Sequence, residues 1–197
     1  MVKQKRKVEK KDLIQSEIYA KNRKKYRKEL LEYKKNRRVP LGPHASFYFE
    51  NFDTMLGQIQ EMLHIEKGGD EQLKDELNAY NPLIPKGNEL VATLMFEIED
   101  IILRQKFLNS VGGIEKNVYI QINNEKIIAD AEKDVDRTSE EGKASSVQFL
   151  HFVFTDKQIE KFKNLANEVE IGIDHPKYGY KIKIIKETRE ALIKDFD

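Results

Sequence analysis

The sequence contains no cysteine. Disulfide bonds, cysteine-ligated zinc, thiolate-held iron–sulfur clusters and thiol nucleophiles are therefore excluded. No stretch approaches the ~18 apolar residues of a membrane-spanning helix, so we expect no membrane interaction. The basic N-terminal stretch is not followed by an apolar segment, which argues against a secretory signal and favours a cytoplasmic protein. A glycine-rich phosphate loop, a zincin motif, a GxSxG elbow and a kinase signature are also missing.

Charge, by contrast, is abundant and unevenly distributed. Charged residues make up 35% of the 197 residues, yet the net charge is only +1. Residues 1–38 hold 16 Lys/Arg and 5 Asp/Glu, a net of +11, whereas residues 39–197 hold 19 and 29, a net of −10. A basic arm on an acidic body can lie on that body, reach a polyanion or dock on an acidic partner. The first interpretation is the simplest, because opposite charges within a Debye length of about 8 Å attract without any partner.

The hydrophobic periodicity predicts an α+β protein with a mixed, largely antiparallel sheet, helices packed on it and a basic N-terminal helix. We expect a disordered basic tail over 1–11 and a single domain over 12–197, divided into a basic helical arm (12–38) and an acidic body (39–197). Asp12 is the expected cap of the first helix, whose apolar stripe is Ile14, Ile18, Tyr26, Leu30 and Tyr33. Further helices are expected over 53–67, 71–80, 100–110, 155–167 and 187–196. Strands are expected over 46–50, 90–98, 118–122, 126–131, 146–154, 168–173 and 180–185, with a loop over 132–145.

The KKNRR stretch at 34–38 ends the basic helix, and Pro40 and the pair Gly42-Pro43 break it. Cations are expected there because they face the negative end of the helix dipole. They can also contact phosphates, and an arginine grips a phosphate or carboxylate with two hydrogen bonds. Lys35, Arg37 and Arg38 are therefore candidate anion- or partner-binding residues.

Two loops supply further candidates for anion or partner binding. Asn81 lies in an apolar segment between two prolines, which either packs on the body or is offered to a partner. His175 and Tyr178 follow a strand end, where functional groups often lie. A local turn with satisfied polar groups is the simpler interpretation of the second loop.

Glu61 and His64 have the Glu-x-x-His spacing that places two metal ligands on one helix face. No second copy of this motif occurs, so a di-iron site is disfavoured and a surface Glu–His pair is the simpler interpretation. A mononuclear site completed by Glu50, Glu97 or His151 is the alternative. The acidic residues of 130–141 lack the glycine that a calcium loop requires, and Val135 stands in its place.

Four blocks of sequence together resemble a bacterial family of uncharacterised proteins, a domain of unknown function. They are KKNRRVPLGPHASFYFEN (34–51), QIQEML (58–63), ELNAYNPLIP (76–85) and DHPKY (174–178), and the resemblance covers about residues 12–195. Members are often encoded beside a rubrerythrin-like protein and a heterodisulfide-reductase-like iron–sulfur oxidoreductase. The resemblance implies an accessory role in peroxide or oxidative-stress handling, and it supplies no catalytic residues.

Three hypotheses follow. The first is a binding or accessory protein for a redox partner, such as a rubrerythrin-like or iron–sulfur protein, with no cofactor of its own. The second is a nucleic-acid or polyanion binder that acts through the basic arm. The third is a metal-dependent enzyme that uses iron or another divalent ion at Glu61 and His64. Convergence of Glu50, Glu61, His64, Glu97, His151 and His175 in the fold would favour the enzyme.

Overall fold

The computed structural model describes residues 5–132 and 142–197 of the chain. Most of the predicted acidic loop, including the calcium-like positions Asp134, Asp136 and Glu141, lies outside these residues, as do residues 1–4. Helices and strands alternate along the described chain, which confirms the α+β class. No helix of the described part has both the length and the hydropathy to cross a membrane.

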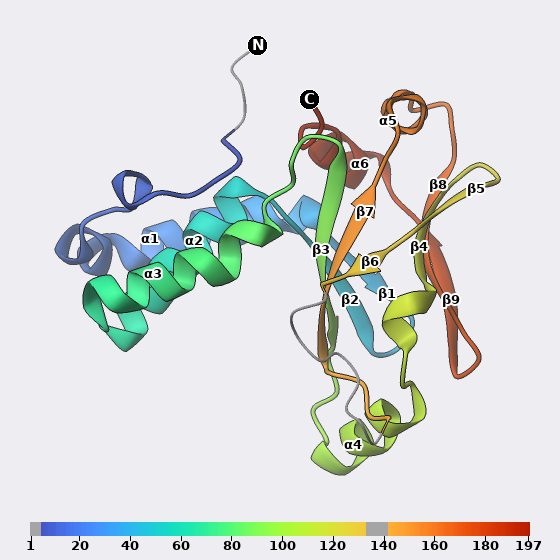
Figure 1. Ribbon diagram of the computed structural model, residues 1–197, viewed down its shortest axis with the longest axis horizontal. Coiled ribbons are helices and arrows are strands. Elements are labelled where there is room, and N and C mark those ends of the chain that lie inside the picture. Colours follow the sequence, from blue (N-terminus) through green and yellow to red (C-terminus); the bar gives the residue numbers. More distant parts are fainter. Residues whose placement is uncertain (1–4, 133–141) are drawn as a thin grey trace.

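The strands form two antiparallel sheets rather than the single mixed sheet of the prediction (Figure 1). In the first sheet the order is β1 (Arg38–Leu41), β2 (Ala45–Glu50), β3 (Glu89–Phe96), β7 (Val147–Val153) and β6 (Asp130–Ala131). In the second sheet it is β5 (Glu125–Ile128), β4 (Val118–Ile122), β8 (Val169–His175) and β9 (Tyr178–Lys183). Residue periodicity shows which face of a strand is buried but not which strand lies beside it. The grouping into two sheets was therefore not readable from the sequence.

The larger hydrophobic core lies between the two sheets. Phe47, Leu94 and Phe152 of the first sheet meet Ile120 and Ile171 of the second, and all five are fully buried. Side chains at alternate positions point to opposite faces of a strand, so this core uses one face of each sheet and leaves the other face available for a different layer.

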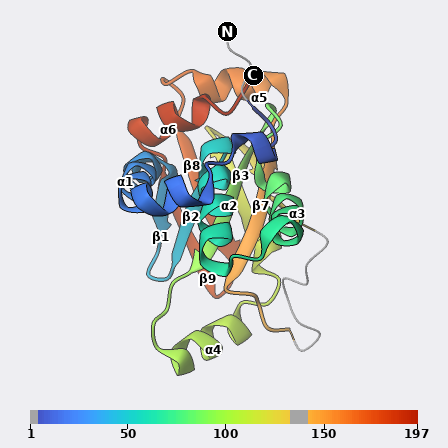
Figure 2. The same cartoon turned by 90° about the vertical axis from the view of Figure 1, so that its left-hand side faces the viewer.

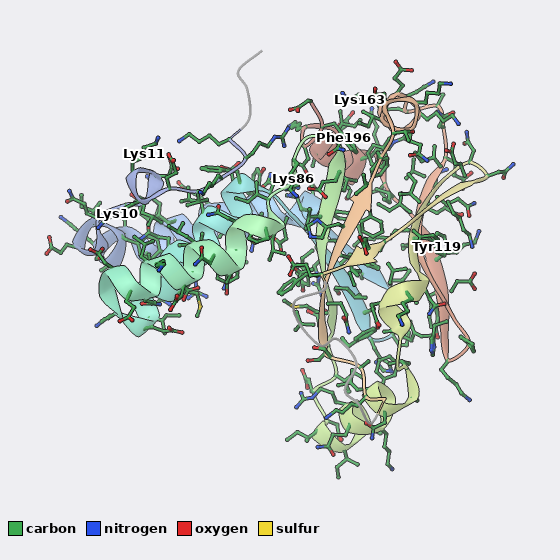
Figure 3. The ribbon with its side chains drawn as sticks, viewed as in Figure 1. Lys10, Lys11, Lys86, Tyr119, Lys163 and Phe196 are labelled. Atoms are coloured by element: carbon green, nitrogen blue, oxygen red, sulfur yellow. The ribbon has the colours of Figure 1, made fainter. Side chains whose placement is uncertain are left out.

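The two ends of this sandwich carry different helices (Figure 1). At one end, α5 (Asp156–Lys163) and α6 (Lys186–Ile193) lie side by side. Phe154, Phe162 and Phe196 form edge-to-face contacts there, and Figure 3 labels Phe196. At the opposite end, α4 (Ile101–Ser110) projects away from the sheets. It begins at Asp100, whose side chain accepts a hydrogen bond from the amide of Leu103.

A group of three helices, called the helical layer below, extends outward from the outer side of the first sheet and meets it at one end (Figures 1 and 2). It consists of α1 (Ser16–Lys34), α2 (Phe52–Glu66) and α3 (Gly69–Tyr80). Three short 3-10 helices lie next to these helices in the chain: η1 (Lys10–Asp12) before α1, η2 (Lys35–Arg37) after α1 and η3 (Asn81–Leu83) after α3. A fourth, η4 (Ile114–Asn117), lies between α4 and β4. A second, smaller core joins the layer to the sheet through Met55, Ile59, Leu73, Leu83 and Val91 of β3.

The first helix differs from its prediction in start and phase. It begins at Ser16 rather than Asp12, and its one buried residue is Tyr19. Ile18 and Tyr33 of the predicted stripe are 47% and 42% exposed. The reason is that α1 packs mainly on α2, so that contact, rather than the largest apolar side chains, sets which face turns inward.

Residues 5–11 also differ from the expected disordered tail. They run along the helical layer, and Val8 is fully buried in the smaller core. The side chain of Asn81 accepts a hydrogen bond from the Val8 amide at 2.7 Å and donates one to its carbonyl at 3.2 Å. Burying one valine side chain is worth roughly 1.5–3 kcal/mol, which helps to hold a short segment of otherwise disorder-prone composition.

Candidate functional site

Arg37, the first of the predicted anion-binding arginines, is used inside the protein. Its side chain is 3% exposed and forms an ion pair with Asp195, whose side chain is 1% exposed. Its guanidinium also donates to the carbonyl oxygens of Phe49 at 2.9 Å, Glu50 at 3.2 Å and Ala191 at 3.3 Å. The arginine thus joins the end of the basic helix to β2 and to the C-terminal segment, and no surface is left for an external anion.

Lys35 and Arg38 lie on the surface, and each contacts a carboxylate of its own chain. Lys35 is 2.7 Å from Glu32, and Arg38 is 2.9 Å from Glu97. Glu97 also accepts a hydrogen bond from the hydroxyl of Tyr48 at 2.6 Å. At this junction between the basic arm and the acidic body, Lys35 thus pairs with a residue of the arm itself, whereas Arg37 and Arg38 pair with residues of the body.

Tyr178 and His175 lie far along the chain from that junction and serve the second sheet. The hydroxyl of buried Tyr178 donates to the carbonyl of Leu41 at 2.6 Å and accepts from the amides of His44 and Ala45 at 3.1 and 3.0 Å. Tyr178 therefore holds the β1–β2 turn against β9. The imidazole of His175 accepts a hydrogen bond from the amide two residues later, which closes the local turn.

Glu61 and His64 share one face of α2, as their spacing predicts, and Tyr19 lies beside both. The Tyr19 hydroxyl donates to Glu61 at 2.7 Å, and its ring meets the His64 ring edge-on at 5.6 Å. Arg23 forms an ion pair with the same carboxylate. Hydrogen bonding to Arg23, against the opposing effect of burial, lowers the pKa of Glu61 to about 2. Both carboxylate oxygens of Glu61 thus have partners within the protein.

The other candidate metal ligands are engaged separately. Glu50 accepts a hydrogen bond from the hydroxyl of Thr93 at 2.8 Å, and His151 contacts Glu89 at 3.0 Å. In residues 5–132 and 142–197, no three side chains of His, Asp or Glu gather as a metal site would require. The convergence that would favour an enzyme is therefore absent from the described part of the chain.

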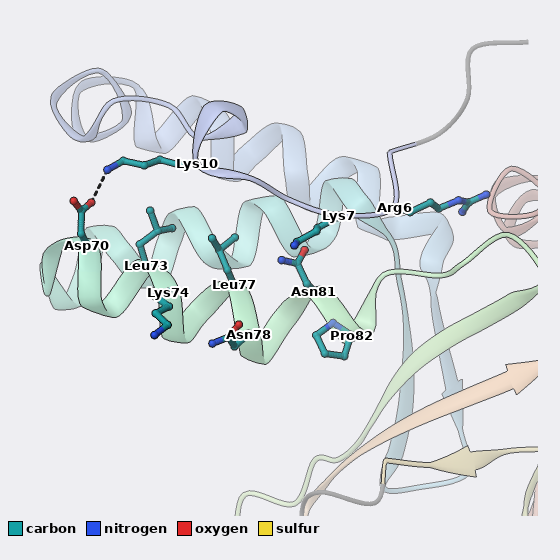
Figure 4. A pocket seen from close by; sticks show the side chains of 10 residues that line it. All are labelled: Arg6, Lys7, Lys10, Asp70, Leu73, Lys74, Leu77, Asn78, Asn81 and Pro82. Carbon is teal, nitrogen blue, oxygen red and sulfur yellow. Dashed lines mark hydrogen bonds and ion pairs between the residues drawn. The ribbon is translucent and has the colours of Figure 1, made fainter.

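A groove along the helical layer is a further candidate site (Figure 4). It lies between the N-terminal segment and α3 and has a volume of about 700 Å³. It is lined by Arg6, Lys7, Lys10, Asp70, Leu73, Lys74, Leu77, Asn78, Asn81 and Pro82. Two contacts hold the walls together: the Asn81 side chain on the backbone of Val8, and the Lys10–Asp70 ion pair at 2.6 Å.

The groove is electropositive. Four of its lining residues are cations and only one, Asp70, is an acid. Arg6 turns toward the C-terminal segment, where it donates to the carbonyl oxygens of Pro85 and Asp195. Lys7 and Lys74 are exposed and have no ion pair with any residue that the structure describes.

The two ammonium groups extend from different walls and do not meet (Figure 4), so each can bind a separate carboxylate or phosphate group. The floor, which includes Leu73, Leu77 and Pro82, can accept an apolar side chain. An anionic ligand with some apolar character fits this combination.

Sequence reasoning named Asn81 but missed the other half of the groove. Lys7 and Lys10 lie in the segment predicted to be a disordered tail, and Lys74 lies in a predicted helix for which the sequence indicates no function. The available signal was Val8, the one large apolar side chain between Lys3 and Lys11. A lone apolar residue in a charged segment marks a point where the segment can be anchored.

The basic face of α1 forms a separate surface. Lys21, Lys24 and Lys28 are exposed, and their spacing of three and four residues puts them on one side of the helix. None of the three has an ion pair within the described residues. A row of exposed cations along one side of a helix suits a long polyanion.

These observations define a class: an α+β protein with two antiparallel sheets and a helical layer that carries an electropositive groove. Residues 7–196 match the family model described as protein of unknown function (DUF3501), and the chain belongs to that family. The match includes every lining residue of the groove except Arg6. The fold is similar to the crystal structure of a novel protein of unknown function from Burkholderia pseudomallei K96243. The TM-score is 0.89 and the identity 36%, over 96% of this chain and 99% of that chain. Comparison with curated proteins gave no match.

Proposed function

We propose that this protein is an accessory binding protein of a redox or oxidative-stress system, and that its groove receives an acidic segment of the partner protein. The observation that carries the proposal is that Lys7 and Lys74, on opposite walls of the groove, form no ion pair with any residue that the structure describes. Opposite charge on the partner would steer its approach and fix its position. The apolar floor of the groove would add affinity for a leucine- or isoleucine-bearing segment.

The choice of a redox partner rests on the family resemblance. Its members are often encoded beside a rubrerythrin-like protein and an iron–sulfur oxidoreductase. An accessory protein needs no redox centre of its own, which agrees with a sequence without cysteine. The two neighbours are therefore the first partners to test.

The test is binding of each purified partner, and of a short fluorescent peptide rich in Glu and Leu, to the full chain. The variant Lys7→Glu/Lys74→Glu should bind at least about tenfold more weakly, a loss of about 1.4 kcal/mol. Lys157→Glu, on the exposed start of α5, is the matched control and should bind like the parent chain. The proposal would be refuted if Lys157→Glu lost as much affinity as Lys7→Glu/Lys74→Glu. It would also be refuted if the parent chain bound neither the peptide nor either partner protein.

A second candidate function is polyanion binding along the basic face of α1. It is favoured by the exposed lysines Lys21, Lys24 and Lys28, which project from one side of the helix. This function predicts binding of a single-stranded oligonucleotide with an affinity that falls steeply with salt. Reversing the three charges should abolish that binding, whereas Lys7→Glu/Lys74→Glu should reduce it little. Absence of oligonucleotide binding at low salt would exclude it.

A further inference from the structure

The tip of α4 is an exposed apolar surface whose residues belong to neither hydrophobic core. Ile101, Ile102 and Leu103 are consecutive, and their side chains are 61%, 64% and 59% exposed. The first buried residue of the helix is Leu108, near its other end. Figures 1 and 2 show α4 projecting from the sheets, away from the helical layer. Three adjacent aliphatic side chains in solvent are costly to solubility and are typical of a contact surface.

The residues just before this tip are acidic. Glu97, Glu99 and Asp100 precede Ile101, and Asp100 caps the helix through the amide of Leu103 at 2.8 Å. Glu97 contacts Arg38 at 2.9 Å, and Glu99 and Asp100 are exposed. The negative charges of Glu99 and Asp100 would be repelled by an anionic membrane surface. A surface that accepts the tip must therefore be apolar at its centre and cationic at its rim.

A groove between α1 and α2 has these properties. It has a volume of about 620 Å³, and its apolar wall includes Tyr26, Leu30, Leu31 and Leu56. Leu31 is 65% exposed. Gly57 forms part of the floor, and a Cβ there would lie 2.5 Å from a methyl group of Leu30. The glycine thus lets the two helices approach closely and leaves the apolar side chains at the surface.

The rim of this α1/α2 groove supplies the matching charge. Arg27 and Lys34 line it, and neither has an ion pair within the described chain. Its four carboxylates are Asp12, Glu29, Asp53 and Glu61. Asp12 pairs with Lys5, Glu61 pairs with Arg23, and Glu29 lies 3.9 Å from Lys25. Asp53 has no ion pair within the described chain, so Arg27 and Lys34 leave the rim with an excess of one positive charge. That charge is complementary to Glu99 and Asp100 at the tip of α4.

We propose that two copies of this chain associate, with the α4 tip of each copy seated in the α1/α2 groove of the other. The tip and groove of one chain lie at separate ends of the molecule in both views, so the contact has to form between copies (Figures 1 and 2). A reciprocal arrangement closes after two chains, as most soluble oligomers do. This interface is distinct from the groove beside Lys7 and Lys74 and does not depend on the function proposed above.

The experiment is sedimentation velocity of the full chain over a range of concentrations. The parent chain is expected to form a dimer. Ile102→Asp and Leu31→Asp should each weaken dimerisation at least about tenfold, because each inserts a charge into an apolar contact. Leu165→Asp is the matched control, since Leu165 is 44% exposed in a turn remote from both surfaces, and it should dimerise like the parent chain. Far-UV circular dichroism verifies that each variant is folded.

A charge exchange identifies which surfaces meet. Arg27→Glu and Glu99→Lys should each weaken the dimer, and the double variant should recover most of the parent affinity. A parent chain that stays monomeric, or a dimer that Ile102→Asp and Leu31→Asp leave unchanged, would overturn the proposal. So would a double variant whose losses simply add, because unrelated sites behave in that way.

Discussion

Removal of Arg37 should destabilise the protein more than removal of its buried partner, Asp195. In Arg37→Met, the Asp195 carboxylate stays buried without its cation. Two carbonyl oxygens of β2, those of Phe49 and Glu50, lose their donor. Breaking one side of a buried ion pair costs about 3–5 kcal/mol.

Asp195→Asn should cost less, about 1–3 kcal/mol, because the guanidinium keeps its three backbone carbonyl acceptors. At about 2–4 °C per kcal/mol for a chain of this size, Arg37→Met should lower the Tm by roughly 6–20 °C. Urea unfolding followed by circular dichroism measures both free energies.

The pH dependence gives a second check on the same pair. Burial raises the pKa of Asp195, and the Arg37 guanidinium opposes that shift without cancelling it. Without Arg37, the pKa of Asp195 should rise further. An acid whose pKa is higher in the folded state favours folding at low pH, where it is protonated, and costs stability above that pKa.

The free energy of unfolding that Arg37→Met loses relative to the parent chain should therefore become smaller as the pH falls from 7 toward 4. The reasoning would be refuted if Arg37→Met lost less than about 1 kcal/mol in the free energy of unfolding, or less than Asp195→Asn loses. It would also be refuted if the loss in Arg37→Met grew on acidification.

Three further outcomes are expected. Gly42→Ala should lower the free energy of unfolding by about 2–4 kcal/mol, because Gly42 has φ +62° and a Cβ would lie 2.8 Å from the hydroxyl of Tyr178 and from the ring of Tyr180. Gly69→Ala, with φ +72° and open space, should lower it by only about 1–2 kcal/mol in the same unfolding assay. Tyr178→Phe leaves the buried amide of Ala45 without its acceptor and should cost about 1–3 kcal/mol, and an unchanged urea midpoint would contradict that role. Arg23→Gln should raise the pKa of Glu61 from about 2 toward 4.5, as a carbon-detected NMR titration would show. The stability from this pair is present above pH 4.5 and is lost as the pH falls toward 2, so a Glu61 that titrates near 4.5 in the parent chain would contradict the assignment.

Local signals in the sequence predicted most helices and strands, but not always their caps or their contacts. The stop before Gly68-Gly69 and the hairpin turn at Asn123 follow from short-range backbone preferences, and the structure has both. The start of α2 is different: the sequence pattern predicts it at Asp53, whereas the helix begins at Phe52 and is capped by Asn51. Asn51, not Asp53, accepts the hydrogen bond from Thr54, since β2 delivers the chain in extended conformation only at Asn51.

The candidate sites show the same division more strongly. The i,i+3 spacing correctly placed Glu61 and His64 on one face of α2, because that relation depends only on helix geometry. The spacing could not show that Tyr19 and Arg23, some forty positions earlier in the chain, donate hydrogen bonds to the Glu61 carboxylate. Likewise, the charge of the KKNRR stretch was evident, but Arg37 and Arg38 look alike in sequence. One is buried against Asp195 and the other is on the surface beside Glu97.

The sequence alone determined the α+β class, the basic arm on an acidic body and the absence of thiol chemistry, because composition and periodicity act locally along the chain. The tertiary structure decided how the strands divide between two sheets and which cations are neutralised within the molecule. It also decided that residues 6–10 form one wall of a groove with α3. Each of these outcomes depends on pairing between residues far apart in the chain, such as Val8 with Asn81 and Arg37 with Asp195. Such pairings follow from the packing of whole layers, which no local pattern encodes.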